Sequence, residues 1–282
     1  MNWQRQKRLS AAASHAALIA MTIGLLFPVY WMVNTSLKGN TLYTDPFSWF
    51  PRAPDLEPYR FWLMDPSSNF WVGLRNSILS VAVACLFALP IGAMAGYALA
   101  RWRTRWIDAV LLTIFLLQMM PSFVTAGPLF RQLTMAGMVG SLPGLFLIYI
   151  AMSLPLTILT VRNYLLALPG EIEEAALVDG ANRWQIFWQI AMPLCKPALA
   201  SSGLFIFVAL WLEYILAQQL MRGSFPNLAI LLIGFSNMGW SGKYRPDYML
   251  SLGVLLMAPV VISFPLMRKY IVSGLSSGAL KG

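Results

Sequence analysis

The segment from Pro169 to Pro197 reads PGEIEEAALVDGANRWQIFWQIAMPLCKP, and it is the longest polar insertion in a chain that is otherwise strongly apolar. Its pattern predicts two short helices around a glycine. Three glutamates near the start suit the positive end of a helix dipole, and Gly180 can end the first helix by taking a left-handed conformation. Apolar residues then recur at helical spacing until Pro193, which we expect to stop the second helix.

The composition around this segment is that of a membrane protein. Of 282 residues, 58% are hydrophobic and 11% are charged, whereas a soluble domain has roughly 25% charged residues. The net charge of +9 does not indicate nucleic-acid binding, because the basic residues cluster beside apolar runs, where they set orientation and meet anionic headgroups. The two cysteines lie in unlike segments, so no disulfide is expected. No Walker A pattern is present, so we do not expect this chain to bind ATP.

Six apolar runs are long enough to span a bilayer, at about 11–33, 70–100, 106–133, 141–164, 198–220 and 249–267. Basic residues favour the segments that place both termini in the cytoplasm. Residues 34–68 form a proline-rich external loop in which a long helix is excluded. Small residues at every fourth position from Ala84 to Ala100 predict a close helix approach, which we interpret as a packing seam within one subunit rather than a subunit interface.

Two features inside the spans indicate a translocation pathway. Prolines interrupt the third and fourth runs, and broken helices of this kind border substrate paths in transporters, although a simple packing kink is the alternative. Glu213 lies in the fifth run, where a carboxylate costs roughly 2.5 kcal/mol or more at mid-membrane, so it should face an interior or an aqueous path unless it is hydrated at the outer interface. The aromatic residues beside Glu213 suit sugar rings, which present apolar faces as well as hydroxyls. The predicted pathway residues are Pro121, Pro155, Trp211, Glu213 and Tyr214.

The segment 169–197 resembles the coupling loop, or EAA loop, of ABC importer permeases. The family pattern is Glu-Ala-Ala, three residues, Gly, nine residues, Ile, one residue, Leu, Pro. In this chain the matching residues are Glu174, Ala175, Ala176, Gly180, Ile190 and Pro193. Met192 replaces the usual Leu, a swap that conserves volume. The alternative is an amphipathic surface helix pair without a partner.

The end of the chain is similar to the tail of the smaller permease subunit of maltose-type carbohydrate importers, which reaches between the ATPases. The matching residues are Gly278, Ala279, Lys281 and Gly282. In that family the outer loop corresponding to residues 221–248 reaches toward an external binding protein, and Trp240 is the contact we expect there.

The resemblance implies an all-α membrane protein with six transmembrane helices and a cytoplasmic two-helix coupling loop. We expect an N-terminal part at 1–68, with the first span and the external loop, and a permease core at 69–282 that holds the coupling loop (about 169–197) and a cytoplasmic tail (about 268–282). The residues implied in coupling to the ATPases are Glu173, Glu174, Ala175, Ala176, Asp179, Gly180, Ile190, Met192 and Pro193.

The function implied is that of a permease subunit in the bacterial inner membrane that forms half of the pathway for a sugar or sugar derivative. Its partners would be a second permease, two ATPase subunits that bind ATP and magnesium, and an extracytoplasmic solute-binding protein; the chain itself would hold no cofactor and catalyse no reaction. An importer of glycerol phosphates or polyols is the alternative within this class. An ion-driven transporter would need several buried ionisable residues, and a membrane enzyme would need a clustered acid–base pair, whereas the spans offer only Glu213.

Overall fold

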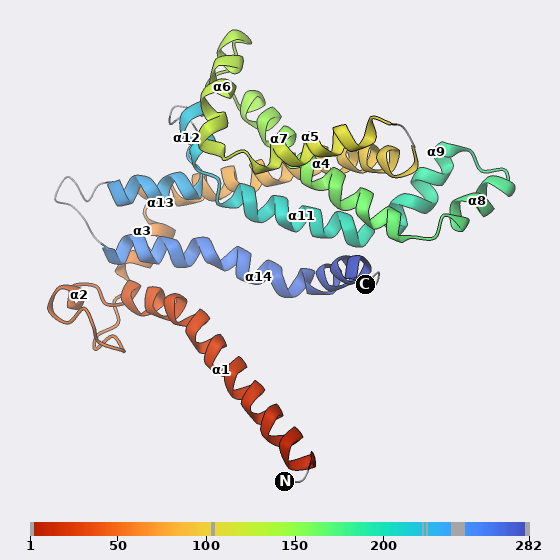
Figure 1. Ribbon diagram of the computed structural model, residues 1–282. Helices are drawn as coiled ribbons and strands as arrows, with labels where there is room; N and C mark the ends of the chain where they lie inside the picture. Colours follow the sequence, from red (N-terminus) through yellow and green to blue (C-terminus); the bar gives the residue numbers. More distant parts are fainter. Residues whose placement is uncertain (1–2, 103–104, 222, 224, 238–245, 280–282) are drawn as a thin grey trace. The chain divides into compact units, whose positions relative to one another are not determined.

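The computed structural model describes all residues except 1–2, 103–104, 222, 224, 238–245 and 280–282 (Figure 1). All regular secondary structure in the described residues is helical, which confirms the predicted fold class. The chain divides into two compact units, residues 1–69 with 232–258 and residues 70–231 with 259–282. The sequence prediction drew a single border after residue 68, whereas the structure groups 232–258 with the N-terminal residues.

The first unit begins with α1 (Trp3–Ser36), whose segment Ala11–Ser36 is long and apolar enough to span a membrane. None of its most apolar window is buried, so this helix has no cover within the described part of its unit. The proline-rich residues that follow form only the short helices α2 (Thr41–Thr44), α3 (Glu57–Met64) and η1 (Pro66–Ser68), as predicted.

Two buried side chains hold the loop residues of this unit together. Lys38 is fully buried; its Nζ donates to the Pro46 carbonyl oxygen at 2.7 Å and lies 4.8 Å from the centre of the Trp31 ring. Trp62 of α3 is 2% exposed, and its Nε1 donates to the Tyr248 carbonyl oxygen at 2.8 Å. The Trp62 ring also lies 5.1 Å from that of Phe235. These contacts explain why 232–258 belong with the N-terminal residues.

The last two helices are α13 (Leu228–Asn237) and α14 (Pro246–Ala279). Our expectation that the sixth span ends at Arg268 and Lys269 was right for the apolar stretch, which covers Pro246–Pro265, but the helix itself continues to Ala279. Basic residues end the apolar stretch of a helix, but they have high helix propensity, so the helical conformation continues past them.

The second unit is organised around α4 (Phe70–Arg101), α7 (Leu142–Ala167) and α11 (Lys196–Trp211). The predicted small-residue seam lies between α4 and α7. A Cβ added to Gly92 would lie 2.6 Å from Thr157 Cβ, and one added to Gly96 would lie 2.9 Å from the Ile158 carbonyl oxygen. The seam therefore serves packing within the subunit, as predicted, because only glycine lets the two helices approach this closely.

Two predicted spans are broken in the structure. The third divides at Pro121 into α5 (Ile107–Met119) and α6 (Ser122–Met135), which meet at 102°. Pro128 and Pro155 stay inside continuous helices, so our expectation that they also interrupt their runs was wrong. In the fifth run, α11 ends at Trp211 and α12 (Ile215–Met221) begins after Tyr214, whereas the sequence predicted one continuous helix.

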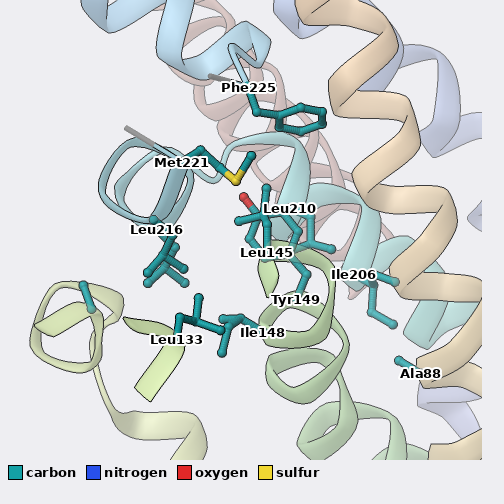
Figure 2. Close-up of a cluster of buried hydrophobic side chains, with 13 residues drawn as sticks. Ala88, Leu133, Leu145, Ile148, Tyr149, Ile206, Leu210, Leu216, Met221 and Phe225 are labelled. Carbon is teal, nitrogen blue, oxygen red and sulfur yellow. The ribbon is translucent and has the colours of Figure 1, made fainter. Parts of the chain in front are cut away.

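By length and composition, the described residues contain four helices able to cross a membrane. The number rises to six if two bent pairs each count as one span: Ile107–Met119 with Ser122–Met135, and Arg183–Leu194 with Lys196–Trp211. The core of the second unit gathers residues from these helices (Figure 2). Tyr149 and Leu145 of α7, Leu210 of α11 and Leu216 of α12 meet there, each at most 5% exposed. This core holds α12 against α7, and it positions the broken end of α11.

Candidate functional site

The polar segment 169–197 folds as a helical hairpin with a defined turn. Helix α8 (Glu171–Val178) ends at Gly180, whose φ is 86°, so the predicted left-handed termination is confirmed. The Gly180 N–H donates to the Leu177 carbonyl at 3.1 Å and the Ala181 N–H donates to the Ala176 carbonyl at 2.9 Å, which is the Schellman pattern. No atom lies within 4 Å of a Cβ built on Gly180, so it is the backbone angle, and not a lack of space, that favours glycine.

A capping box begins the second helix of the hairpin. Asn182 Oδ1 accepts from the Gln185 N–H at 2.9 Å, and the Asn182 N–H donates to Gln185 Oε1 at 2.8 Å. Helix α9 (Arg183–Gln185) starts there and continues as the π-helical stretch η2 (Ile186–Ala191) and α10 (Met192–Leu194). The two motifs define the turn of four residues, 179–182, between α8 and α9.

The second helix does not stop at Pro193, contrary to our expectation. It runs to Leu194 and then bends by 67° into α11 after Cys195. The π-helical register explains this continuation: the Met192 N–H bonds to the Phe187 carbonyl, five residues back, so the backbone widens just before the proline. Ile190 and Met192 are half-buried beside this bend, and Pro193 is exposed.

Glu173 anchors α8 to the end of span α4. Its Oε1 accepts from Arg101 Nε at 2.9 Å and Arg101 Nη2 at 2.7 Å, and its Oε2 accepts from the Tyr97 hydroxyl at 3.1 Å. The Glu173 side chain is 9% exposed and that of Arg101 is 23% exposed. The Tyr97 ring in turn lies 5.2 Å from that of Phe187, which joins the second helix to the same anchor.

Much of the remaining surface of the hairpin is exposed and apolar. Val178 is 88% exposed, Trp184 is 61% exposed, and Ile172, Leu177 and Trp188 are each about two-fifths exposed. Glu174, Ala175 and Asp179 are also exposed, so the predicted motif residues lie on an accessible surface. Glu173 is the exception, because its carboxylate is buried and bonds to Arg101 and Tyr97 within the chain.

A second candidate site is a cavity of about 460 Å³ between α5, α6, α7 and α11. Glu213 and Pro155, both predicted as pathway residues, line it; Pro121, Trp211 and Tyr214 do not. Trp211 is instead buried, with its ring 5.3 Å from that of Phe207. Since Pro155 has no N–H, the Ala151 carbonyl, whose residue also lines the cavity, loses its partner within the helix.

Glu213 caps the break between α11 and α12. Its carboxylate accepts from the Leu216 N–H at 2.6 Å, the Ala217 N–H at 3.1 Å and the Tyr149 hydroxyl at 2.5 Å. Asn227 Nδ2 donates to the Glu213 carbonyl at 2.9 Å. These donors hold the carboxylate at the cavity wall. The carboxylate in turn accepts from backbone N–H groups at the start of α12 that would otherwise be unpaired.

Sequence reasoning missed the partners of both carboxylates. Neither Arg101, at the end of one apolar run, nor Tyr149, inside another, was singled out from the sequence as a partner of a carboxylate. Each of these two residues is far in sequence from the carboxylate that it contacts, so no local sequence pattern indicates the pair. Trp240, Lys281 and Gly282 lie outside the described residues, while Gly278 and Ala279 belong to the last turn of α14.

The comparisons with known proteins agree with this geometry. Residues 88–277 match the family described as "Binding-protein-dependent transport system inner membrane component". The chain belongs to this family. The match includes the hairpin 169–197 and the cavity residues, so both features lie in the part of the chain that defines the family. It also confirms the prediction of a transporter permease subunit rather than an enzyme.

Several curated relatives are similar over nearly their whole length. The chain is 33% identical to a diacetylchitobiose uptake system permease protein of Streptomyces coelicolor over 94% of this chain and 95% of that protein. It is 33% identical to a trehalose/maltose transport system permease protein of Thermococcus litoralis, covering 94% of each. A sulfoquinovosyl glycerol transport system permease protein of Agrobacterium fabrum is 31% identical over 95% of this chain and 92% of that one.

A solved structure confirms the fold. A chain of a bacterial ABC transporter involved in the import of the acidic polysaccharide alginate matches with a TM-score of 0.76 at 23% identity, covering 96% of this chain and 99% of that one. At this sequence identity the structural similarity supports the fold and not a shared substrate.

Proposed function

We propose that this chain forms one permease half of a binding-protein-dependent importer for a sugar or sugar derivative, and that the α8–α9 hairpin couples it to ATP hydrolysis on separate subunits. The observation that carries the coupling role is that the hairpin is both anchored and exposed. Glu173 bonds it to Arg101 at the end of span α4, while apolar side chains and Glu174 remain exposed. A surface helix without a partner would not expose Val178 and Trp184 so fully.

In this mechanism the hairpin acts as a rigid lever. The exposed side of α8 sits in a groove of an ATPase subunit, where Glu174 offers a charge to a basic partner and Ala175 allows close approach. The capped turn at Gly180 keeps the two helices at a fixed angle. Movement of the ATPase then passes through Glu173 to Arg101 at the end of α4, and through the bend after Leu194 to α11. Nucleotide shifts the balance between inward and outward access only through its different affinity for the two states.

We further propose that the cavity at Glu213 borders the path of the substrate. Its wall combines apolar side chains with a few groups that can bond hydroxyls: Gln118, Ser122, Thr125, Ser153 and Glu213. Sugars present both apolar faces and hydroxyls, which suits this mixture. The relatives' names support the same class, since they specify diacetylchitobiose, trehalose or maltose, and sulfoquinovosyl glycerol.

One feature of the cavity disfavours the glycerol-phosphate alternative. Glu213 is the charged residue among those that line it, and the lining includes no lysine or arginine. A phosphate ester passing this wall would meet a carboxylate and no compensating cation, which is unfavourable in a low-dielectric site. A neutral sugar carries no such penalty.

The remaining partners and the orientation follow from the same proposal. The permease pairs with a second permease and with two ATPases that bind ATP and magnesium. Both termini lie in the cytoplasm of a bacterial cell, and the end of the chain from Gly278 to Gly282 reaches the ATPases. The external binding protein docks on the outer loop that includes Trp240.

Reconstituted transport tests the coupling role at Gly180. Proline cannot adopt the φ of 86° and would lose the hydrogen bond to Leu177, so we expect Gly180→Pro to abolish uptake while basal ATP hydrolysis continues. Gly180→Asn is the matched control, since asparagine tolerates this region and should retain most of the uptake. Uptake by Gly180→Pro at the wild-type rate would refute the proposed coupling role of the hairpin.

A thermal-shift screen of the cognate binding protein against sugars, polyols and phosphate esters identifies the substrate.

A further inference from the structure

A second, more polar pocket of about 600 Å³ lies where spans α4 and α7 end beside the hairpin. Three arginines line it: Arg101 from α4, Arg162 from α7 and Arg183 from α9. Glu173 and Glu174 of α8 form part of the same wall. The pocket is therefore lined by residues of five helices, α4, α5, α7, α8 and α9, and it brings three guanidinium groups together with two carboxylates.

Two of the three guanidinium groups have no carboxylate partner among the described residues. Arg101 is compensated by Glu173 at 2.7 Å. Arg162 Nε is buried without a hydrogen-bond partner, and its Nη1 reaches only Asn163 Oδ1 at a long 3.4 Å. Arg183 is exposed, and no described ion pair includes it. A buried charged donor without an acceptor is unfavourable, so the arrangement fits an anion that this chain does not supply.

The surroundings of the pocket are those of a membrane interface. Trp102, which lines it, is 72% exposed, and Leu166, which also lines it, is 43% exposed. Close by in sequence, Trp106 is 64% exposed with the Arg105 guanidinium 5.3 Å from its ring centre. Exposed tryptophans beside arginines at the end of apolar spans are typical of headgroup depth in a bilayer.

We propose that this pocket binds the phosphate group of an anionic phospholipid headgroup through Arg162 and Arg183. Guanidinium and phosphate pair through parallel, charge-assisted hydrogen bonds, which would supply the missing acceptor at Arg162 Nε. The exposed Trp102 and Leu166 give the acyl chains and glycerol backbone an apolar surface beside it. Because α8 forms one wall, a bound lipid would brace the hairpin against the bilayer. This binding goes beyond the proposed transport function and does not depend on which solute is carried.

Native mass spectrometry of the full-length chain tests the proposal, with the protein purified in detergent together with any subunits that accompany it. After delipidation, phosphatidylglycerol and phosphatidylcholine are added back at equal concentration. Both lipids carry the phosphate, but the choline cation of phosphatidylcholine is repelled by the arginines, so we expect the wild type to retain phosphatidylglycerol about tenfold more tightly. Arg162→Gln and Arg183→Gln should each lose that preference. Arg105→Gln removes the same charge outside the pocket lining and should keep it.

The outcomes separate the sources of the phosphate. Arg183 is exposed, so Arg183→Gln remains informative even if Arg162→Gln does not fold. Equal retention of the two lipids by the wild type, or an undiminished preference in both pocket variants, would overturn the proposal. If inorganic phosphate in excess displaces the bound lipid only from proteins that keep both arginines, the shared phosphate chemistry is supported. If the pocket variants bind lipid normally and lose only their ATPase subunits, the arginines contact a protein partner and the lipid site is wrong.

Discussion

The ion pair between Arg101 and Glu173 should contribute measurably to stability, and a double-mutant cycle can isolate its contribution. The carboxylate accepts two hydrogen bonds from Arg101, and the two side chains are 23% and 9% exposed. Hydrogen bonds to charged groups contribute about 1.5–3 kcal/mol each, while exposed ion pairs contribute about 0–1 kcal/mol. For this partly buried pair we expect a coupling energy of about 1.5–3 kcal/mol between Arg101→Gln and Glu173→Gln.

The chain provides its own control in the ion pair between Arg52 and Asp45. Its atoms are 3.0 Å apart, but the side chains are 81% and 35% exposed. The same cycle on this pair should give less than about 1 kcal/mol and should weaken further at high salt, because exposed charges are screened. The two pairs have the same kinds of charged group, a guanidinium and a carboxylate, and differ mainly in how far their side chains are buried.

Both cycles can be measured by unfolding the purified protein in mixed micelles of increasing SDS content, at low and high salt. The Arg101–Glu173 coupling should exceed that of Arg52–Asp45 and change less with salt. Glu173→Gln should also reduce uptake per ATP hydrolysed if the anchor transmits movement. A coupling energy for Arg101–Glu173 no larger than that of the exposed pair would refute the reasoning that burial gives this anchor its strength.

Two further substitutions test the second unit by the same unfolding assay. Gly92→Ala places a methyl group 2.6 Å from Thr157, so we expect a loss of about 1–3 kcal/mol, whereas Gly127→Ala meets no atom within 4 Å and should be neutral or slightly stabilising; equal effects would contradict the close seam. Tyr149→Phe should cost about 1–2 kcal/mol because the Glu213 carboxylate loses one of three donors, and a neutral result would show that this hydroxyl is not needed to hold it.

The sequence was most informative where a structure is specified locally. Apolar length located the spans, because a helix in lipid must satisfy its backbone within itself. The left-handed turn at Gly180 could be predicted from one residue, because only a glycine there has no Cβ to clash. The small-residue seam from Ala84 to Ala100 was likewise visible, because spacing by four puts small side chains on one helix face.

Prolines were a weaker guide than we expected. Pro121 breaks its span through 102°, whereas Pro128, Pro155 and Pro193 lie inside helical runs. A proline removes one donor, but whether the helix bends depends on what satisfies the freed carbonyl. At Pro193 the preceding π-helical register widens the backbone, and at Pro155 the adjacent cavity leaves room.

The amino-acid sequence by itself determined the class of protein, most of the apolar spans and the helical hairpin at 169–197, since these depend on composition and on contacts between near neighbours. Only the tertiary structure decided what each carboxylate does. Glu173 and Glu174 are adjacent in sequence, yet one bonds to Arg101 and the other is exposed, because successive residues of a helix point in different directions. Glu213 caps α12 locally, through the Leu216 and Ala217 N–H groups, but its third donor is the hydroxyl of Tyr149, 64 residues away, at 2.5 Å. Such pairs are made by packing, which no local pattern contains.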